Sequence, residues 1–209
     1  MEIVVLLFDR MTALDAIGPV EVLQPLPDAH ATSASPLAGP VRTNTGGLVL
    51  HADRSLEAVL EADMLLVPGG YGTRELIRNQ SLLQSLRELD ARTTWTVSVC
   101  TGSLVLAAAG LLQGRPATTH WSCRSDLVAL GAKPMPQRVV FDGKYVTAAG
   151  VSAGIDLALE LAGRIAGEEL AQSIQLGIEY DPQPPWDCGC VDKAPIEVVD
   201  LATARLLAD

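Results

Sequence analysis

One cysteine stands where an apolar strand-like run meets an Ala-rich helix-like run. Residues 95–99 are apolar or β-favouring, Cys100 follows, and an apolar stretch then runs to Gly110, with only Thr101 and Gly102 between the two. This pattern predicts a strand–turn–helix that holds Cys100 at the carboxyl edge of a parallel sheet, as a nucleophile elbow holds its serine. The amino end of the helix would face the sulfur and favour the thiolate, the nucleophilic form. The alternative is a buried core cysteine, which is what most free cysteines are.

Two other polar side chains follow predicted strands. Asp15 comes after the apolar run 3–8 and before a helix, so it is either an N-cap or a functional carboxylate at the edge where open α/β sheets bind ligands. His120 follows a strand-like Thr118-Thr119 pair, and we interpret it as either a general base or a hydrogen-bonded structural histidine.

Glycines follow another buried run, 64–67. The segment 68–73 lacks GxGxxG and a Lys-Ser/Thr pair, so it does not indicate a phosphate loop. We expect its glycines to let backbone N–H groups approach a reacting atom. The substrate would then lie against Gly70, Tyr71 and Gly72, and residues elsewhere on the same sheet edge would complete the binding site, namely Gly150, Val151 and His120.

The elements that must position these residues alternate along the chain. Short apolar runs predict strands at 3–8, 64–67 and 95–99, and 30–38 is interpreted as an edge strand and loop. Gly-Gly and Asp-Gly turns predict hairpins over 41–51 and 139–148. Helices are expected near 16–24 (with Pro19 in the first turn), 55–61, 82–92, 102–110, 122–130, 155–165, 168–178 and 198–207, and a surface loop over 181–195. The alternation predicts an α/β fold: a flavodoxin-like three-layer sandwich, with a mostly parallel central sheet and helices on both faces.

Composition favours some classes of protein and disfavours others. The 209 residues are 48% hydrophobic with a formal net charge of −10, which favours a single domain over 1–209 and disfavours nucleic acid and acidic membranes as partners. The sequence shows no signal peptide and no 20-residue apolar run, so we expect a cytoplasmic protein. Cys188-Gly189-Cys190 has no second Cys or His pair nearby, so we predict no metal site.

These motifs resemble those of the DJ/PfpI cysteine-elbow superfamily, which includes class I glutamine amidotransferases, and within it the isonitrile (isocyanide) hydratase family most closely. The resemblance covers nearly the whole chain. It rests on six stretches, namely Leu14-Asp15 with Gly18-Pro19, Pro68-Gly69-Gly70, Ser98 to Leu106, Ala109 to Gly114, Ala117 to Trp121 and Ser152 to Asp156. Thr101 stands where the protease-like branch carries a histidine, which argues against a Cys-His protease.

The resemblance implies a cofactor-free homodimer that adds water to an isonitrile and releases an N-substituted formamide. Residue by residue it makes Cys100 the nucleophile, Asp15 the essential carboxylate and Thr101 the neighbouring hydroxyl. Attack of a thiolate on the isonitrile carbon would give a thioimidate, with Asp15 donating a proton and then activating water. Two alternatives stay open: another cysteine-dependent enzyme that processes glyoxals or amides, and a ligand-sensing domain related to AraC-type transcription regulators.

Overall fold

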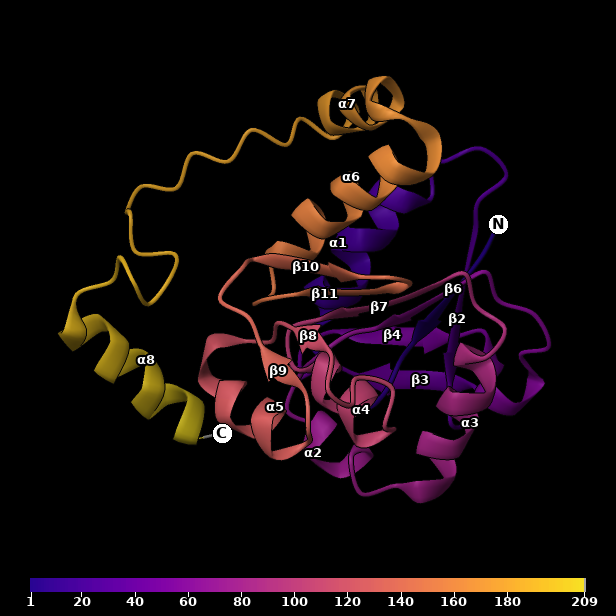
Figure 1. Cartoon of the computed structure of the whole chain (residues 1–209), viewed down its shortest axis with the longest axis horizontal. Coiled ribbons are helices and arrows are strands. Elements are labelled where there is room, and N and C mark those ends of the chain that lie inside the picture. The colour runs from indigo at the N-terminus through magenta and orange to yellow at the C-terminus, as the bar shows by residue number, and fades with distance from the viewer. Residues whose placement is uncertain (209) are drawn as a thin grey trace.

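The computed structural model describes residues 1–208 and is built around a seven-stranded sheet (Figure 1). The strand order is β10-β11-β7-β6-β1-β2-β5, and every neighbouring pair is parallel except the β10–β11 hairpin. The strands are β1 (Glu2–Leu6), β2 (His30–Ser35), β5 (Arg54–Ser55), β6 (Met64–Val67), β7 (Trp95–Val99), β10 (Val139–Asp142) and β11 (Tyr145–Ala148). This confirms the predicted mostly parallel sheet; of the predicted range 1–209, Asp209 lies outside the described residues.

The central strands are buried on both faces. All four residues of β6 are fully buried, and Ile3 to Leu6 of β1 are at most 4% exposed. Strands covered by helices on both sides read as continuous apolar runs, which is why the sequence predicted these strands well.

Helices cover both faces of the sheet, as expected (Figure 1). On one face α1 (Ala13–Leu23) packs against α6 (Ala153–Ala166), which in turn packs against α7 (Glu168–Gly177). The other face carries α2 (Thr73–Leu76), α3 (Gln80–Asp90), α4 (Gly102–Ala108) and α5 (Arg124–Ala129). The α1–α6 pair is close because glycines lie between them. A Cβ on Gly154 would stand 3.1 Å from Pro19 Cγ, and one on Gly18 would stand 3.1 Å from Ile155 Cγ1.

The first helix differs from its prediction. It begins at Ala13 with Thr12 at the N-cap position, and Pro19 lies in its interior rather than in its first turn. The N-cap interpretation of Asp15 is therefore wrong, because Asp15 is the third helical residue. Thr12 is of a residue type that favours N-caps, but its side chain makes no cap hydrogen bond here.

Other boundaries also moved. The strand β2 is not at the edge, because β5 pairs with it in parallel over two residues. A short 3-10 turn (Leu56–Ala58) replaces the predicted helix 55–61. The strand predicted at Thr118-Thr119 lies two residues earlier, as β8 (Pro116–Ala117), which pairs with β9 (Lys133–Pro134). Both predicted hairpins are present, one as β3 (Gly39–Arg42) with β4 (Val49–Ala52) and one as β10–β11.

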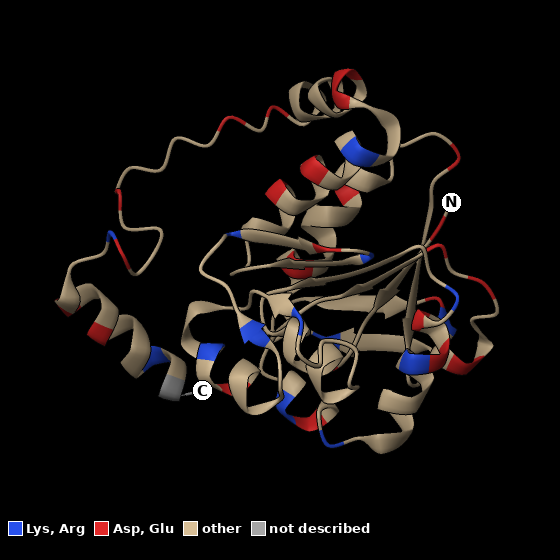
Figure 2. Ribbon diagram, in the orientation of Figure 1, with Lys and Arg blue, Asp and Glu red and all other residues tan. Residues whose placement is uncertain are grey.

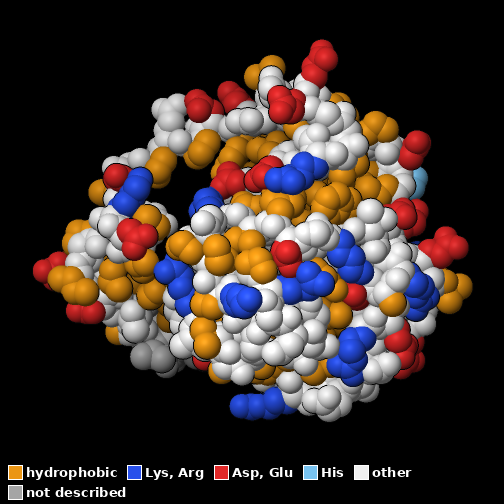
Figure 3. Space-filling view, viewed as in Figure 1, with side chains coloured by type: hydrophobic (Ala, Val, Ile, Leu, Met, Phe, Trp, Pro, Cys, Tyr) orange, Lys and Arg blue, Asp and Glu red, His pale blue; other side chains and the backbone are white. Residues whose placement is uncertain are grey.

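The end of the chain leaves the sheet. Residues 181–195, which we call the arm, contain no helix or strand and lead to α8 (Ile196–Ala208), which lies beside α5 in Figure 1. Figure 3 shows an opening between the arm and the rest of the molecule, and Figure 2 shows acidic positions along α6, α7 and the arm. No helix within residues 1–208 has the length and apolar character to cross a membrane.

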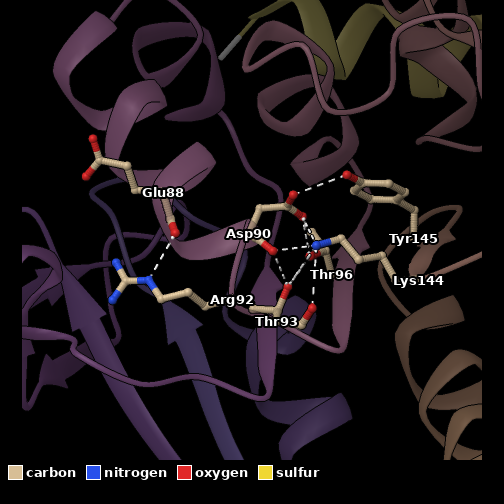
Figure 4. Close-up of polar contacts among 7 residues, drawn as sticks. All are labelled: Glu88, Asp90, Arg92, Thr93, Thr96, Lys144 and Tyr145. Carbon is tan, nitrogen blue, oxygen red and sulfur yellow. Dashed lines mark hydrogen bonds and ion pairs between the residues drawn. The ribbon is translucent and has the colours of Figure 1, made fainter.

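A polar network closes the amino ends of β7 and β11 (Figure 4). Asp90, at the end of α3, accepts hydrogen bonds from Thr96 (2.6 Å) and Tyr145 (3.2 Å) and pairs with Lys144 at 3.1 Å. Burial and the neighbouring Asp90 raise the pKa of the Tyr145 hydroxyl. This network joins a helix to two strands at the end of the sheet opposite Cys100.

Candidate active site

Cys100 occupies a sharp turn between β7 and α4. It is 6% exposed and has a φ of 58°, in the left-handed region that few residues other than glycine adopt. Its N–H donates to the carbonyl of Ala149 at 2.7 Å, and its own carbonyl accepts from the hydroxyls of Thr119 (3.1 Å) and Ser103 (3.2 Å). Such a backbone costs about 1–3 kcal/mol and persists only where surrounding contacts hold it. These hydrogen bonds are the contacts that hold it here.

The loop after β6 packs directly on this turn. A Cβ on Gly69 would lie 2.5 Å from the Thr101 nitrogen and 2.8 Å from Cys100 Cβ, and one on Gly102 would lie 2.1 Å from the carbonyl oxygen of Val67. These positions exclude any side chain, because real Cβ contacts are never that short. Gly69 and Gly102 therefore bring the ends of β6 and β7 together at the cysteine.

The Asp15 carboxyl reaches the same place from the first turn of α1. It is fully buried, and its Oδ2 accepts a hydrogen bond from the Gly69 N–H at 2.9 Å. Its Oδ1 is buried without a hydrogen-bond partner of standard geometry, although the Cys100 thiol is close enough to interact with the carboxyl. Burial raises the pKa of Asp15 from 3.8 to about 7, against the opposing effect of the Gly69 hydrogen bond.

The structure corrects the expected acidity of the cysteine. Burial raises the pKa of the Cys100 thiol, and the nearby Asp15 charge raises it further, while the N–H groups of Thr101 and Val151 act in the opposite direction. The prediction counted only the helix terminus, but α4 has just seven residues and the thiol is buried next to a carboxyl. A thiolate at Cys100 is therefore favoured only when Asp15 holds the proton, so the two groups titrate as a pair.

The N–H groups of the glycine loop are already engaged, contrary to expectation. The Gly69 N–H binds Asp15, the Gly70 N–H donates to Thr101 Oγ1 at 2.9 Å, and the Gly72 N–H donates to the Arg10 carbonyl at 3.2 Å. These groups hold the loop in place and are not directed at a reacting atom. The N–H groups that face the sulfur belong to Thr101 and Val151.

The Thr101 side chain fastens the loop to the turn. Besides accepting from Gly70, its hydroxyl accepts from Thr73 Oγ1 at 3.2 Å. Thr101 is thus next to Cys100 in sequence, but its hydroxyl makes these hydrogen bonds with the loop after β6 and with the start of α2.

A cavity of about 170 Å³ opens above Cys100. The structure brings six of the predicted site residues to its wall, namely Gly70, Tyr71, Cys100, Thr101, His120 and Val151. Two predicted substrate-binding residues lie elsewhere. Gly72 packs on the Asp9 carbonyl, where a Cβ would be 2.0 Å away, and Gly150 packs under the His120 ring and lines a neighbouring cavity of about 420 Å³.

His120 separates the two cavities and lines both. Its Nδ1 accepts from the Ser122 N–H (3.4 Å) and contacts Ser122 Oγ at 2.8 Å, which caps the 3-10 turn Trp121–Cys123. Burial lowers the pKa of His120, so the ring is neutral at pH 7 with its proton on Nε2. In this geometry the ring caps a turn and forms part of the cavity wall.

Sequence reasoning missed the rest of the wall. Its members lie in loops, on short helices or on α8 and carry no motif, namely Thr12, Asn44, Arg74, Ser122, Cys123 and Leu206. Asn44 Nδ2 donates to Thr12 Oγ1 at 3.0 Å and so joins the β3–β4 hairpin to the start of α1. Leu206 comes from α8, more than a hundred residues after Cys100. Only the tertiary structure brings these residues together.

Comparisons with known proteins agree with this architecture. Residues 1–164 match the model of the DJ-1/PfpI family, and the chain belongs to that family. An isonitrile hydratase of Pseudomonas putida is 44% identical over 205 residues, covering 98% of this chain and 90% of the relative.

Two further proteins are similar to this chain at lower sequence identity. The crystal structure of a ThiJ/PfpI family protein from Pseudomonas syringae superposes with a TM-score of 0.93 at 35% identity, over 99% of this chain and 86% of that one. The HTH-type transcriptional regulator CdhR of Pseudomonas aeruginosa is 33% identical over 156 residues, which is 70% of this chain but 44% of the regulator.

Proposed function

We propose that this chain is an isonitrile hydratase that uses Cys100 as its nucleophile and Asp15 as its acid–base group. The observation that carries the proposal is the buried Asp15 carboxyl beside the Cys100 thiol, in a chain 44% identical to an isonitrile hydratase over nearly its whole length. A carboxyl with a pKa of about 7 exchanges protons readily at neutral pH, which suits a general acid–base group.

The reaction begins with one proton on the Cys100–Asp15 pair. Transfer of that proton from sulfur to the carboxylate gives the thiolate and the neutral acid. The thiolate forms a bond to the terminal carbon of the isonitrile, and Asp15 protonates that carbon, giving a thioimidate in which carbon is doubly bonded to nitrogen. Asp15 is then an anion next to an electrophilic carbon.

Hydration completes the cycle. Asp15 takes a proton from water as the oxygen adds to the thioimidate carbon, and returns that proton to the nitrogen. Asp15 then removes the hydroxyl proton as the carbon–sulfur bond breaks, which releases the formamide and restores the thiolate with a protonated Asp15. One water is consumed, and no electrons are exchanged with a cofactor.

The backbone around the cysteine supports the charged sulfur. The N–H groups of Thr101 and Val151 lower the free energy of the thiolate, both before attack and when it leaves. The hydroxyls of Thr119 and Ser103 hold the Cys100 carbonyl and so fix the direction of the thiol. Thr119 and Ser103 are positioning residues in this scheme.

The deciding test is formamide formation from an aromatic and an aliphatic isonitrile, followed by NMR or mass spectrometry. Wild-type enzyme should release the N-substituted formamide with both, and Cys100→Ser should release none, because a hydroxyl is a far weaker nucleophile without a strong base. Absence of formamide with wild type, or turnover by Cys100→Ser, would exclude the proposal.

We also propose that the enzyme is a homodimer. Apolar side chains are exposed on α1, where Leu14 is 43% and Ile17 is 37% exposed, and on the arm and α8, where Trp186 is 75% and Leu201 is 62% exposed. Burying such surfaces against a second copy is favourable at roughly 25 cal/mol per Å² of apolar area. Light scattering at micromolar concentration should give twice the chain mass of 22.0 kDa, and a monomer would contradict the proposal.

A further inference from the structure

The cavity above Cys100 has one charged residue on its described wall. Arg74, the second residue of α2, lines the cavity together with Cys100, Tyr71 and His120. Burial keeps His120 neutral, as described above, and the other described wall residues are apolar or uncharged polar. The carboxyl of Asp15 is fully buried and does not line the cavity. Arg74 is therefore the one residue with a formal charge among the described residues of the wall.

Arg74 is held toward the cavity by an aromatic ring. Its guanidinium carbon lies 5.2 Å from the centroid of the Tyr71 ring, and Arg10 lies 5.6 Å from the same centroid. Stacking of a guanidinium on an aromatic face orients the planar group and leaves its N–H donors free to bind a ligand. Burial raises the pKa of Cys123, a second residue of the cavity wall, and the charge of Arg74 opposes this rise, so that charge is felt at the cavity wall.

No carboxylate neutralises Arg74 at salt-bridge distance among the described residues. The ion pairs of residues 1–208 all involve other cations. Asp126 lines an adjoining cavity with Arg74, and its charge acts on the pKa of Cys123 in the opposite direction to that of Arg74. In a chain of net charge −10, this exposed guanidinium on the cavity wall would attract an anionic substrate.

We infer that Arg74 selects isonitriles that carry a carboxylate on the nitrogen substituent. This inference rests on the proposed function. The terminal carbon must reach the sulfur of the buried Cys100, so the substituent on nitrogen extends toward the exposed part of the wall, to which Arg74 belongs. A guanidinium binds a carboxylate through two parallel N–H···O bonds, which fixes both position and charge. The cavity of about 170 Å³ has room for a small isonitrile acid.

The test compares isocyanoacetate with its methyl ester, which differ in charge but share the isonitrile group. Wild-type enzyme should have the higher kcat/KM with the acid, and Arg74→Gln should lower the acid-to-ester ratio about tenfold, the size of one exposed charge-assisted contact. Arg74→Lys should keep most of the ratio, and Arg74→Glu should reduce it below that of Arg74→Gln. Added salt should weaken the preference of the wild type, because the contact is solvent-accessible.

Arg78→Gln is the matched control, because Arg78 is exposed four residues away and does not line the cavity. It should leave both substrates unchanged. An acid-to-ester ratio that Arg74→Gln alters less than twofold, or a wild-type preference for the ester, would overturn the inference while leaving the proposed hydratase intact.

Binding measured without turnover distinguishes a failure of the proposed function from a failure of the inference about Arg74. If neither isonitrile is hydrated, the proposed function fails, and the inference is then decided by NMR titration with N-formylglycinate and its methyl ester. Weaker binding of N-formylglycinate to Arg74→Gln, by about tenfold and without a like change for the ester, supports a carboxylate site. Equal binding of N-formylglycinate to wild type and Arg74→Gln refutes it.

Discussion

Replacing Asp15 by Asn should abolish hydration and at the same time stabilise the fold at neutral and alkaline pH. Asn keeps the size of the side chain, and its oxygen can still accept the hydrogen bond from the Gly69 N–H at 2.9 Å. It cannot take up or release a proton. The substitution thus removes the acid–base function and the cost of a buried charge in one step.

The size of the stabilisation follows from the raised pKa. Asp15 titrates at about 7 in the folded protein and near 3.8 when unfolded, so between these values the folded state binds a proton that the unfolded state does not. Folding stability therefore falls as pH rises through this window, by about 1.4 kcal/mol per pH unit and up to about 4 kcal/mol above pH 7. Asn has no such penalty, so the advantage of the variant should be small at pH 4 and reach a plateau near pH 8.

The assay is urea unfolding of wild type and Asp15→Asn at pH 5 and pH 8, beside kcat/KM for an isonitrile. Asp181→Asn is a suitable control, because Asp181 is exposed on the arm. The variant should gain more stability at pH 8 than at pH 5 and lose at least about a hundredfold in kcat/KM, as is typical for a general acid–base group. Equal stability gains at the two pH values would refute the buried-charge reasoning, and activity within a few fold of wild type would refute the catalytic role.

Four other expectations test separate parts of the structure. The kcat/KM of wild type should fall about tenfold per pH unit below pH 7, since a second proton on the Cys100–Asp15 pair blocks thiolate formation; a flat profile from pH 5 to 9 would contradict this. Thr119→Val removes the hydroxyl that holds the Cys100 carbonyl, so it should reduce kcat more than KM and cost about 1–2 kcal/mol of unfolding free energy. An unchanged kcat would count against the positioning role. Gly69→Ala places a Cβ 2.5 Å from a backbone nitrogen and should lower both activity and stability, the latter by about 1–3 kcal/mol in urea unfolding, whereas an unchanged variant would mean that the loop is not tightly packed. Asp90→Ala leaves the buried ends of its partners unpaired and should cost roughly 3 kcal/mol while kcat/KM stays the same, because the network lies at the far end of the sheet; a loss of activity in the folded variant would argue against that independence.

The sheet was the most predictable part of the molecule. Runs such as 64–67 are apolar at every position because helices cover both faces of β6, so the sequence itself indicates a buried strand. The turn at Cys100 was also predictable, since its local signals change from strand to helix within three residues. Its positive φ follows from the same geometry.

The parts that failed depend on contacts between distant segments. The sequence marks Asp15 as a residue between a strand and a helix, but only the packing of Gly69 on Asp15 shows that its oxygen binds the loop rather than capping α1. The expected anion-stabilising role of the glycine loop failed for the same reason, because Thr101 accepts the Gly70 N–H. The acidity of Cys100 was predicted with the wrong sign, since the sequence shows the helix terminus but not the burial.

Two unfavourable features of the fold, at Asp15 and Cys100, lie next to each other, and their proximity bears on function. A buried carboxyl with an unpartnered oxygen and a cysteine in the left-handed region each destabilise the native state, yet the surrounding core holds both in contact. Neither feature is needed to close the sheet, because the neighbouring strands are satisfied by their own hydrogen bonds and burial. A carboxylate accepts a proton from a thiol more readily when its own pKa is high, and burial raises the pKa of Asp15 to about 7. In the proposed mechanism, this raised pKa is what allows Asp15 to serve in turn as acid and base.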